Sequence, residues 1–373
     1  MDFGISEEQR DIQELARQIL GDLATPVRLA ACDNYASERF DEELWRRLSE
    51  AGLLGLAVPE EFGGMGFGFM ELALLCEEIG RTIAPVPVLT HVVGGILPLC
   101  LFGSDGQKQR LLPGAVAGEH LLSVALEEDA AVRVITARAD AGGYRVNGEI
   151  FAVPFAHRAK RVLIAAHTDN GVVALLLDPA ASGVSCTPMK TTSYEPQSLL
   201  RMENVLVEAD DVLAGPDRGA AVIASITRHM TVALCAHQVG VTDSMMRQTA
   251  AYTTERKQFG VPIATFQAVG HRAANCFIDV ECLRLCTYQA ASLLDTGETA
   301  TVETDIAKIW AGDVGHRVSY AAQHLHGGAG VDRGNALWRY CLWARYNEMM
   351  LGSSAARLAA LGARCASGEA LID

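Results

Sequence analysis

Residues 252–263 read Tyr-Thr-Thr-Glu-Arg-Lys-Gln-Phe-Gly-Val-Pro-Ile and separate two long helical segments. The guanidinium of Arg256 offers a planar fork of N–H donors, which suits the oxygens of a diphosphate. Gly260 and Pro262 are turn-forming residues, so the segment predicts a loop that presents Arg256 between two helices. An ion pair between Arg256 and Glu255, or another carboxylate, is the alternative interpretation.

A second loop lies further along the chain, where residues 323–330 read Gln-His-Leu-His-Gly-Gly-Ala-Gly. Gly327 and Gly328 carry no side chain, so their backbone N–H groups can approach a phosphate closely. A glycine cluster by itself fits a simple turn between helices equally well. Both loops nevertheless suit a phosphate ligand.

Helical periodicity surrounds both loops. Apolar residues at helical spacing predict four long helices over residues 220–255, 263–295, 299–325 and 335–366. The faces of these segments are rich in Ala, Gly and Ser, which favours a closely packed bundle and a buried oligomer interface.

The part of the chain before this bundle changes character once. The first third shows helical spacing of apolar residues. From about residue 121, short runs rich in Val, Ile and Thr predict strands, with a hairpin turn over residues 140–143. We therefore expect an α+β fold with three domains: an N-terminal helical domain (1–119), a middle β domain (120–218) and a C-terminal helical bundle (219–373).

The composition indicates a folded, acidic protein. Half of the 373 residues are hydrophobic, and 31 Lys and Arg stand against 45 Asp and Glu, a formal net charge of −14. This balance opposes a broad basic surface for nucleic acid or anionic lipid. No apolar run approaches the roughly 20 residues of a membrane span, and no signal peptide pattern opens the chain. Ten irregularly spaced Cys fit reduced thiols, so we expect a cytoplasmic protein without membrane or nucleic-acid partners.

The first loop resembles the R-x-x-F-G signature of the acyl-CoA dehydrogenase family, and residues 323–330 are similar to that family's Q-x-x-G-G-x-G. The resemblance extends over essentially the whole chain and implies the family fold, with a C-terminal four-helix bundle. In the family, both motifs hold the ADP half of FAD across a subunit interface, while the flavin ring sits in the neighbouring chain. The resemblance thus implies FAD as cofactor and a set of cofactor contacts: Arg256, Gln258, Phe259, Gln323, His324, Gly327 and Gly328.

The catalytic base of the family is absent from both of its usual places. Family enzymes use a glutamate to remove a proton next to the thioester. In this sequence Leu351 stands where one family branch has the glutamate, and Met230 stands at the alternative position, beside Thr231. Neither Leu nor Met accepts a proton, so we expect no catalytic residue in this chain.

The segments that face the flavin depart from the family as well. The T-E-P-x-x-G-S-D stretch corresponds to residues 125–131, where only an acidic residue, Glu127 or Glu128, remains. The W-I-T segment aligns with residues 152–154, Ala-Val-Pro, which lack the stacking ring and the threonine donors. Features of one flavin pocket are missing together, while the two loops that serve a neighbour's cofactor persist.

This combination resembles the base-lacking subunits of heteromeric (α2β2) acyl-CoA dehydrogenases from actinobacteria. It implies a FAD-associated, non-catalytic subunit that supplies the ADP-side clamp to a homologous catalytic partner. That partner would bind most of the acyl-CoA substrate, which is dehydrogenated between its α and β carbons. The resemblance favours bulky acyl-CoA esters, such as steroid side chains, as the substrate class.

Other interpretations stay open at this point. Glu348, one helical turn before Leu351, is a candidate relocated base for an active homotetramer, although an ion pair with Arg345 fits it better. His229 reads as an ordinary helix-face histidine. A structural or regulatory relative that binds no flavin is a different class, as is a flavin monooxygenase or nitroalkane-oxidising branch. We expect no metal site, because three nearby cysteines fit buried thiols better than zinc ligands: Cys276, Cys282 and Cys286.

Overall fold

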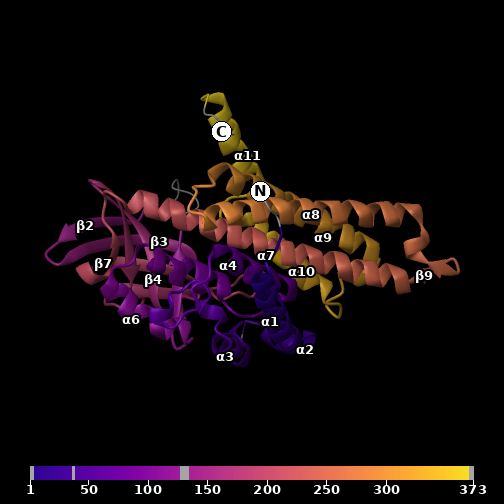
Figure 1. Ribbon diagram of the computed structural model, residues 1–373, viewed down its shortest axis with the longest axis horizontal. Coiled ribbons are helices and arrows are strands. Elements are labelled where there is room, and N and C mark those ends of the chain that lie inside the picture. The colour runs from indigo at the N-terminus through magenta and orange to yellow at the C-terminus, as the bar shows by residue number, and fades with distance from the viewer. Residues whose placement is uncertain (1–3, 36–37, 127–133, 369–373) are drawn as a thin grey trace. The chain divides into compact units, whose positions relative to one another are not determined.

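The computed structural model, drawn in Figure 1, describes residues 4–35, 38–126 and 134–368. Helices, then a sheet, then helices follow one another along the chain, which confirms the predicted α+β fold class. Glu127 and Glu128 lie outside the described residues. The N-terminal helices are α1 (Glu7–Leu23), α2 (Pro26–Cys32), α3 (Glu42–Glu50), α4 (Phe69–Thr82), the π-helix η3 (Leu89–Ile96), α5 (Leu97–Phe102) and α6 (Asp105–Val116).

The strands and the C-terminal helices have the following bounds. The strands are β1 (Leu121–Ala125), β2 (Thr136–Asp140), β3 (Gly143–Pro154), β4 (Ala159–Thr168), β5 (Gly171–Leu177), β6 (Val184–Met189), β7 (Gln197–Glu208), β8 (Val212–Ala214), β9 (Lys257–Gln258) and β10 (Val261–Pro262). The helices are α7 (Gly219–Glu255), α8 (Gln267–Asp295), α9 (Thr301–His326), the 3-10 helix η7 (Gly327–Gly330), α10 (Leu337–Met349) and α11 (Ser354–Ala366).

The chain folds into two compact units. The first, called here the bundle unit, comprises Met1–Pro26, Ala73–Ala84 and Thr231–Asp373, and the second, the sheet unit, comprises Val27–Leu72 and Pro85–Met230. Each unit therefore gathers segments that are distant in sequence. The division into three sequential domains stays a prediction.

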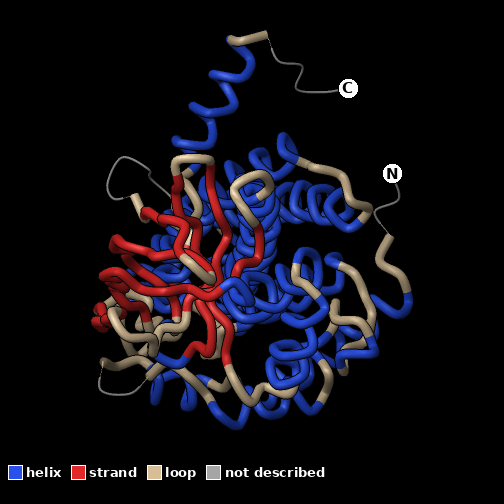
Figure 2. Tube along the Cα trace, turned by 90° about the vertical axis from the view of Figure 1, so that its left-hand side faces the viewer, coloured by secondary structure: helices blue, strands red, loops and turns tan. Residues whose placement is uncertain are grey.

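The sheet unit is built around one sheet, whose strands are red in Figure 2. The strand order is β6-β7-β3-β2-β4-β5-β8, and β1 pairs with β4 in parallel. Asp140 pairs with Gly143 across the β2–β3 hairpin, which leaves a two-residue turn and confirms the predicted hairpin. Val, Ile, Leu and Ala side chains from β2 to β7 fill the core on the sheet.

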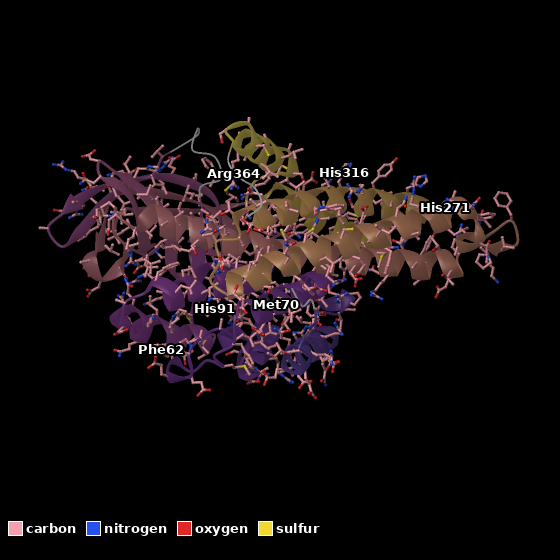
Figure 3. The ribbon with its side chains drawn as sticks, turned by 45° about the horizontal axis from the view of Figure 1, so that its top comes forward. Phe62, Met70, His91, His271, His316 and Arg364 are labelled. Carbon is pink, nitrogen blue, oxygen red and sulfur yellow. The ribbon has the colours of Figure 1, made fainter. Side chains whose placement is uncertain are left out.

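A buried histidine ties the helical part of the sheet unit to β1. His91, labelled in Figure 3, lies in η3 and has no solvent-exposed surface. Its Nδ1 accepts a hydrogen bond from the backbone N–H of Leu122 at 2.9 Å, and its Nε2 donates to the carbonyl oxygen of Ala115 at 3.0 Å. Both ring nitrogens are thus paired with backbone groups, so the neutral ring closes this part of the core.

The bundle unit packs α7 to α10 closely and buries charge among them. Gly240 lets α7 approach α4, because an added Cβ there would lie 1.9 Å from the carbonyl oxygen of Glu77. The Glu77 carboxylate is fully buried and accepts hydrogen bonds from Arg81, Arg284 and, at 2.7 Å, from the Tyr288 hydroxyl. These hydrogen bonds and the two guanidinium charges offset the free energy lost when the Glu77 carboxylate is removed from water.

The last predicted helix, over residues 335–366, is in fact two helices. The break falls at Leu351 and Gly352, which both have positive φ angles, 55° and 88°. Ser353 then caps α11 by accepting a hydrogen bond from the N–H of Ala356. Arg357 donates to the carbonyl oxygen of Leu351 at 3.0 and 2.5 Å, so a tertiary contact holds a turn that the periodicity of the sequence does not predict.

One helix is longer and more apolar than the sequence expectation allowed. By length and composition α7 could cross a membrane, with a mean hydropathy of 1.4 over an 18-residue window, whereas no other described helix could. The expectation that no run approaches such a length was therefore too strict. Of that window 61% is buried within the protein, as in the core helix of a bundle.

Candidate functional site

The first predicted loop forms a two-residue hairpin at the end of α7. β9 and β10 pair antiparallel, and the turn residues Phe259 and Gly260 both have positive φ angles, 55° and 83°. This is the twist that two-residue hairpins prefer, and glycine adopts it without strain, whereas phenylalanine pays about 1 kcal/mol or more. The Phe259 side chain is 94% exposed. A strained turn thus holds an aromatic ring in solvent.

Arg256 is anchored by its backbone and open at its side chain. Its N–H donates to the carbonyl oxygen of Tyr252, and its own carbonyl oxygen accepts from the N–H of Ile263, both at 2.8 Å. The residue is exposed, and its guanidinium forms no ion pair or side-chain hydrogen bond with any described residue. The predicted alternative, an ion pair with Glu255, is therefore not what this structure contains.

The second predicted loop follows α9 and lies next to the first. The ring of Tyr252 stacks on His326 at 4.2 Å between centroids, and its hydroxyl donates to the carbonyl oxygen of His326 at 3.4 Å. Gly327 and Gly328 are exposed, and an added Cβ on either would meet nothing within 4 Å. Side-chain packing does not require glycine at Gly328, which leaves its backbone accessible to a ligand.

His324 and Gln323 differ in exposure near the end of α9. His324 is exposed, and its Nδ1 accepts a hydrogen bond from Nη1 of Arg272 at 2.6 Å, whereas Gln323 is half-buried. Gln258 is exposed and donates from Nε2 to the neighbouring carbonyl oxygen of Lys257. The sequence does not predict the contact of Arg272 with His324, because only the register between α8 and α9 brings the two residues together.

Residues 6–119 match the acyl-CoA dehydrogenase N-terminal domain, and residues 217–366 match the acyl-CoA dehydrogenase C-terminal domain. The chain belongs to the acyl-CoA dehydrogenase family. Members of this family are FAD-dependent oxidoreductases that act on acyl-CoA. The family and the fold implied by the sequence resemblance are thus confirmed.

Several relatives are similar over nearly the whole chain. Acyl-CoA dehydrogenase FadE27 of Mycobacterium tuberculosis is 34% identical over 378 residues, which cover 99% of this chain and 100% of that protein. A chain of the ChsE4-ChsE5 complex from Mycobacterium tuberculosis is 35% identical, with a TM-score of 0.92, covering 98% of this chain and 99% of that one. A chain of the Tcur3481-Tcur3483 steroid ACAD variant is 39% identical, with a TM-score of 0.90 and the same coverage.

The two positions that the sequence resemblance assigns to the family's glutamate base hold apolar side chains. Leu351 is buried in the turn between α10 and α11. Met230 is partly buried and packs against an apolar cluster of the sheet unit. Glu348, the candidate relocated base, forms an ion pair with Arg345, so a partner already engages its carboxylate. Neither Leu351 nor Met230 can accept a proton.

The segment aligned with the family's flavin-facing W-I-T forms an irregular part of β3. Ala152 has a positive φ angle of 57°, within a register shift between β3 and β7. Pro154 is buried, and its carbonyl oxygen accepts a hydrogen bond from the Ser123 hydroxyl at 2.5 Å. A methyl group and a ring without N–H thus stand where the sequence resemblance expects an indole and hydroxyl donors.

The remaining candidates have structural explanations. His229 is buried, its Nδ1 lies 2.8 Å from the carbonyl oxygen of Ser225, and burial lowers its pKa. Burial raises the pKa of Cys276 and Cys286, as for inert thiols. Among the described residues, no group of three or more His, Cys, Asp or Glu is placed to hold a metal ion.

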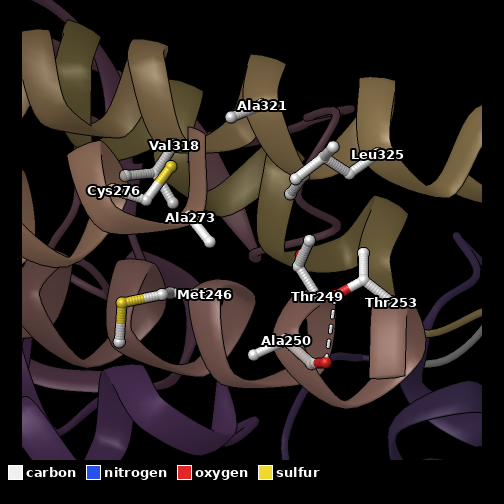
Figure 4. A pocket seen from close by; sticks show the side chains of 10 residues that line it. Met246, Thr249, Ala250, Thr253, Ala273, Cys276, Val318, Ala321 and Leu325 are labelled. Atoms are coloured by element: carbon white, nitrogen blue, oxygen red, sulfur yellow. Dashed lines mark hydrogen bonds between the residues drawn. The ribbon is translucent and has the colours of Figure 1, made fainter. Parts of the chain in front are cut away.

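A small apolar pocket lies between α7, α8 and α9 (Figure 4). Its volume is about 20 Å³, room for about one water molecule. Side chains such as Met246, Cys276 and Leu325 line it, and it cannot hold an acyl chain.

Proposed function

We propose that this chain is a FAD-associated, non-catalytic subunit of a heteromeric acyl-CoA dehydrogenase. In this role it contacts the ADP half of a FAD whose flavin ring lies in a homologous catalytic partner. We call the contact residues the clamp: Arg256, Gln258, Phe259, Gln323, His324, Gly327 and Gly328. The partner binds most of the acyl-CoA and carries the base. The ten cysteines are all unpaired thiols, which suits a reducing compartment, and we propose that the assembly acts in the cytoplasm.

The observation that carries the proposal is the hairpin at the end of α7. Arg256 and Phe259 are both exposed, and the ring contact of Phe259 within the described residues is an edge contact with Phe266, at 6.3 Å between centroids. A strained turn that keeps an aromatic ring 94% exposed is costly unless something outside the chain covers it. A nucleotide shared with another subunit is such a ligand.

The residues of the clamp fit the ADP half of FAD. The guanidinium of Arg256 can donate to two phosphate oxygens, and the open backbone at Gly327 and Gly328 can approach a phosphate. The ring of Phe259 offers an apolar face to the nucleotide. When bound, FAD supplies the acceptor for the hydride that leaves the β carbon of the acyl-CoA.

The absence of a base explains why the proposed role is non-catalytic. Removal of the α proton needs a carboxylate or a comparable base within hydrogen-bond reach of the reacting carbon. Leu351 and Met230 cannot supply it, Ala152 lacks a ring to stack on a flavin, and Pro154 has neither a hydroxyl nor an N–H donor. A partner with a complete flavin pocket would make the assembly active.

The relatives support a heteromeric assembly and a bulky substrate. One similar chain comes from a structure described as a complex of two proteins, ChsE4 and ChsE5, and another from a steroid ACAD. By analogy, we propose that this chain assembles with a homologous subunit and that the assembly acts on a bulky acyl-CoA ester such as a steroid side chain.

The test is to purify the chain alone and together with its homologous partner, and to measure flavin absorbance and acyl-CoA oxidation. We expect activity only for the pair. An active, flavin-containing homo-oligomer would refute the proposal and favour Glu348 as base, and a pair without flavin would favour a structural relative. Within the pair, Arg256→Ala should weaken flavin retention by about 1.5–3 kcal/mol through loss of a charge-assisted contact. Unchanged flavin occupancy on dilution would contradict the assignment of Arg256.

A further inference from the structure

Two side-chain pairs join α8 to α9 at equivalent levels of the bundle unit. Arg317 of α9 donates to both carboxylate oxygens of Asp279 on α8, at 2.8 Å each. Seven residues away on each helix, Arg272 of α8 donates to Nδ1 of His324 on α9 at 2.6 Å. Because the offsets of seven residues run in opposite directions along the two helices, the two pairs occupy the same register of an antiparallel helix pair.

The two levels differ in charge. In Figure 3 the label His316 marks the level of Arg317 on α9, and the label His271 marks the level of Arg272 on α8. A carboxylate compensates Arg317, but no carboxylate forms an ion pair with Arg272 within the described parts of the chain. The protein has an excess of 14 acidic groups, so this gap is not due to a shortage of carboxylates. Arg272 thus lies beside the glycine loop without a carboxylate partner, which suits the binding of an anionic ligand.

The hydrogen bond from Arg272 also fixes the state of His324. A guanidinium only donates, so Nδ1 of His324 is the acceptor, which leaves Nε2 as the N–H donor of the ring. His324 is exposed, and this N–H is directed away from Arg272. The ring of Tyr320, 62% exposed, lies nearly parallel to the imidazole at 6.4 Å and 5.9 Å from the guanidinium. The group combines cationic, N–H and aromatic surfaces.

We propose that Arg272 is a second cationic contact of the clamp and that, together with Arg256, it binds the phosphate oxygens of an adenosine diphosphate group. His324 donates to the same ligand from Nε2. The contact of Tyr252 with His326 brings the base of the Arg256 hairpin to this end of α9. The inference rests on the proposed function, to which it adds a residue that no family motif assigns.

The first experiment measures flavin retention in the flavin-loaded assembly with its partner. We expect Arg272→Gln to raise the dissociation constant of FAD about 10- to 100-fold, as loss of a charge-assisted contact does. Arg272→Lys keeps the charge and should recover part of this affinity. Arg317→Gln is the matched control, because it removes an equivalent α8–α9 contact from the neighbouring level, and it should leave retention within twofold.

The outcomes separate the inference from the proposed function. Equal retention in Arg272→Gln and Arg317→Gln, with weaker retention in Arg256→Gln, would overturn the inference and leave the clamp standing. Weaker retention in Arg272→Gln than in Arg317→Gln, at similar melting temperatures, supports a ligand contact rather than a structural role. If no flavin-loaded assembly forms, the proposed function fails and a second measurement decides the inference.

That second measurement is calorimetric titration of the purified full chain with ADP and, separately, with coenzyme A. Binding of ADP that is lost in Arg272→Gln and kept in Arg317→Gln supports the inference. ADP binding that is equal in both variants, or absent from the wild type, overturns it. Coenzyme A contains an adenosine diphosphate with a further phosphate, so tighter binding of coenzyme A than of ADP, lost in Arg272→Gln, would assign the contact to the substrate and overturn its place in a flavin site.

Discussion

Acidification should weaken the sheet unit through His91. Burial lowers the pKa of His91 from its usual 6.5 to about 4, because a charged ring would lose its hydration in the core. A proton on Nδ1 would also face the N–H of Leu122, which now donates to that atom. Protonation is thus opposed both by the surroundings and by the hydrogen-bond geometry.

The sign and size of the effect follow from these two pKa values. Between pH 6.5 and pH 4 the unfolded chain binds a proton at this histidine and the folded chain does not, so the free energy of unfolding falls as the pH falls. The contribution is fully present above pH 6.5. From pH 7 to pH 5 the loss amounts to ~2 kcal/mol, and it approaches ~3 kcal/mol at pH 4.

The assay is urea unfolding of wild type and His91→Phe at pH 7 and pH 5, followed by circular dichroism. At pH 7 we expect the variant to be less stable by ~2–4 kcal/mol, because two buried backbone groups lose their partners. At pH 5 this difference should shrink by ~2 kcal/mol, since only the wild type carries the titrating ring. His91→Gln, which retains polar atoms but does not titrate, is the control. A difference that stays constant within about 0.5 kcal/mol between the two pH values would refute the reasoning.

Two further predictions concern the bundle unit. Lys308 is fully buried and donates to two carbonyl oxygens at the end of α10, at 2.9 and 3.0 Å, so Lys308→Met should lower the free energy of unfolding by ~2–4 kcal/mol in urea, and an unchanged midpoint would contradict this role. Gly240→Ala should destabilise the chain by more than ~3 kcal/mol, because its Cβ would meet the Glu77 carbonyl oxygen at 1.9 Å. Gly270→Ala, in an open part of α8, is the matched control and should raise the free energy of unfolding by about 0.5–1 kcal/mol. Both variants are compared by thermal unfolding, and equal midpoint temperatures would refute the packing argument.

The sequence predicted the regular elements well, because their periodicity is local. Helical spacing marked α7, α8 and α9 to within a few residues, and the Gly-rich turn marked the β2–β3 hairpin. The break at Leu351 was not predictable in this way. A leucine with positive φ is unfavourable by itself, and the turn depends on Arg357, whose contact forms only after the helices pack.

In the candidate site too, local sequence motifs indicated some residues, and contacts made by helix packing were not predictable. The resemblance named Arg256 and Phe259, whose assignment to a cofactor stays a prediction, but nothing local in the sequence indicates the strain at Phe259 or its exposure. Arg272 was missed because its partner lies 52 residues away and is chosen by the register of α8 against α9. Contacts between helices carry information that no single-segment pattern contains.

The geometry of α9 separates the proposed nucleotide contacts from the position where the resemblance expects a base. The turn with Leu351 is held near the start of α9, where Ser354 donates to the carbonyl oxygen of Ile309. His326, which contacts the base of the Arg256 hairpin, ends the same helix 17 residues later, a rise of about 25 Å. The Leu351 turn and the Arg256 hairpin therefore both contact α9, at positions far apart along the helix. A substitution at Leu351 therefore need not disturb the Arg256 hairpin, so the proposed cofactor contacts do not depend on a base at residue 351.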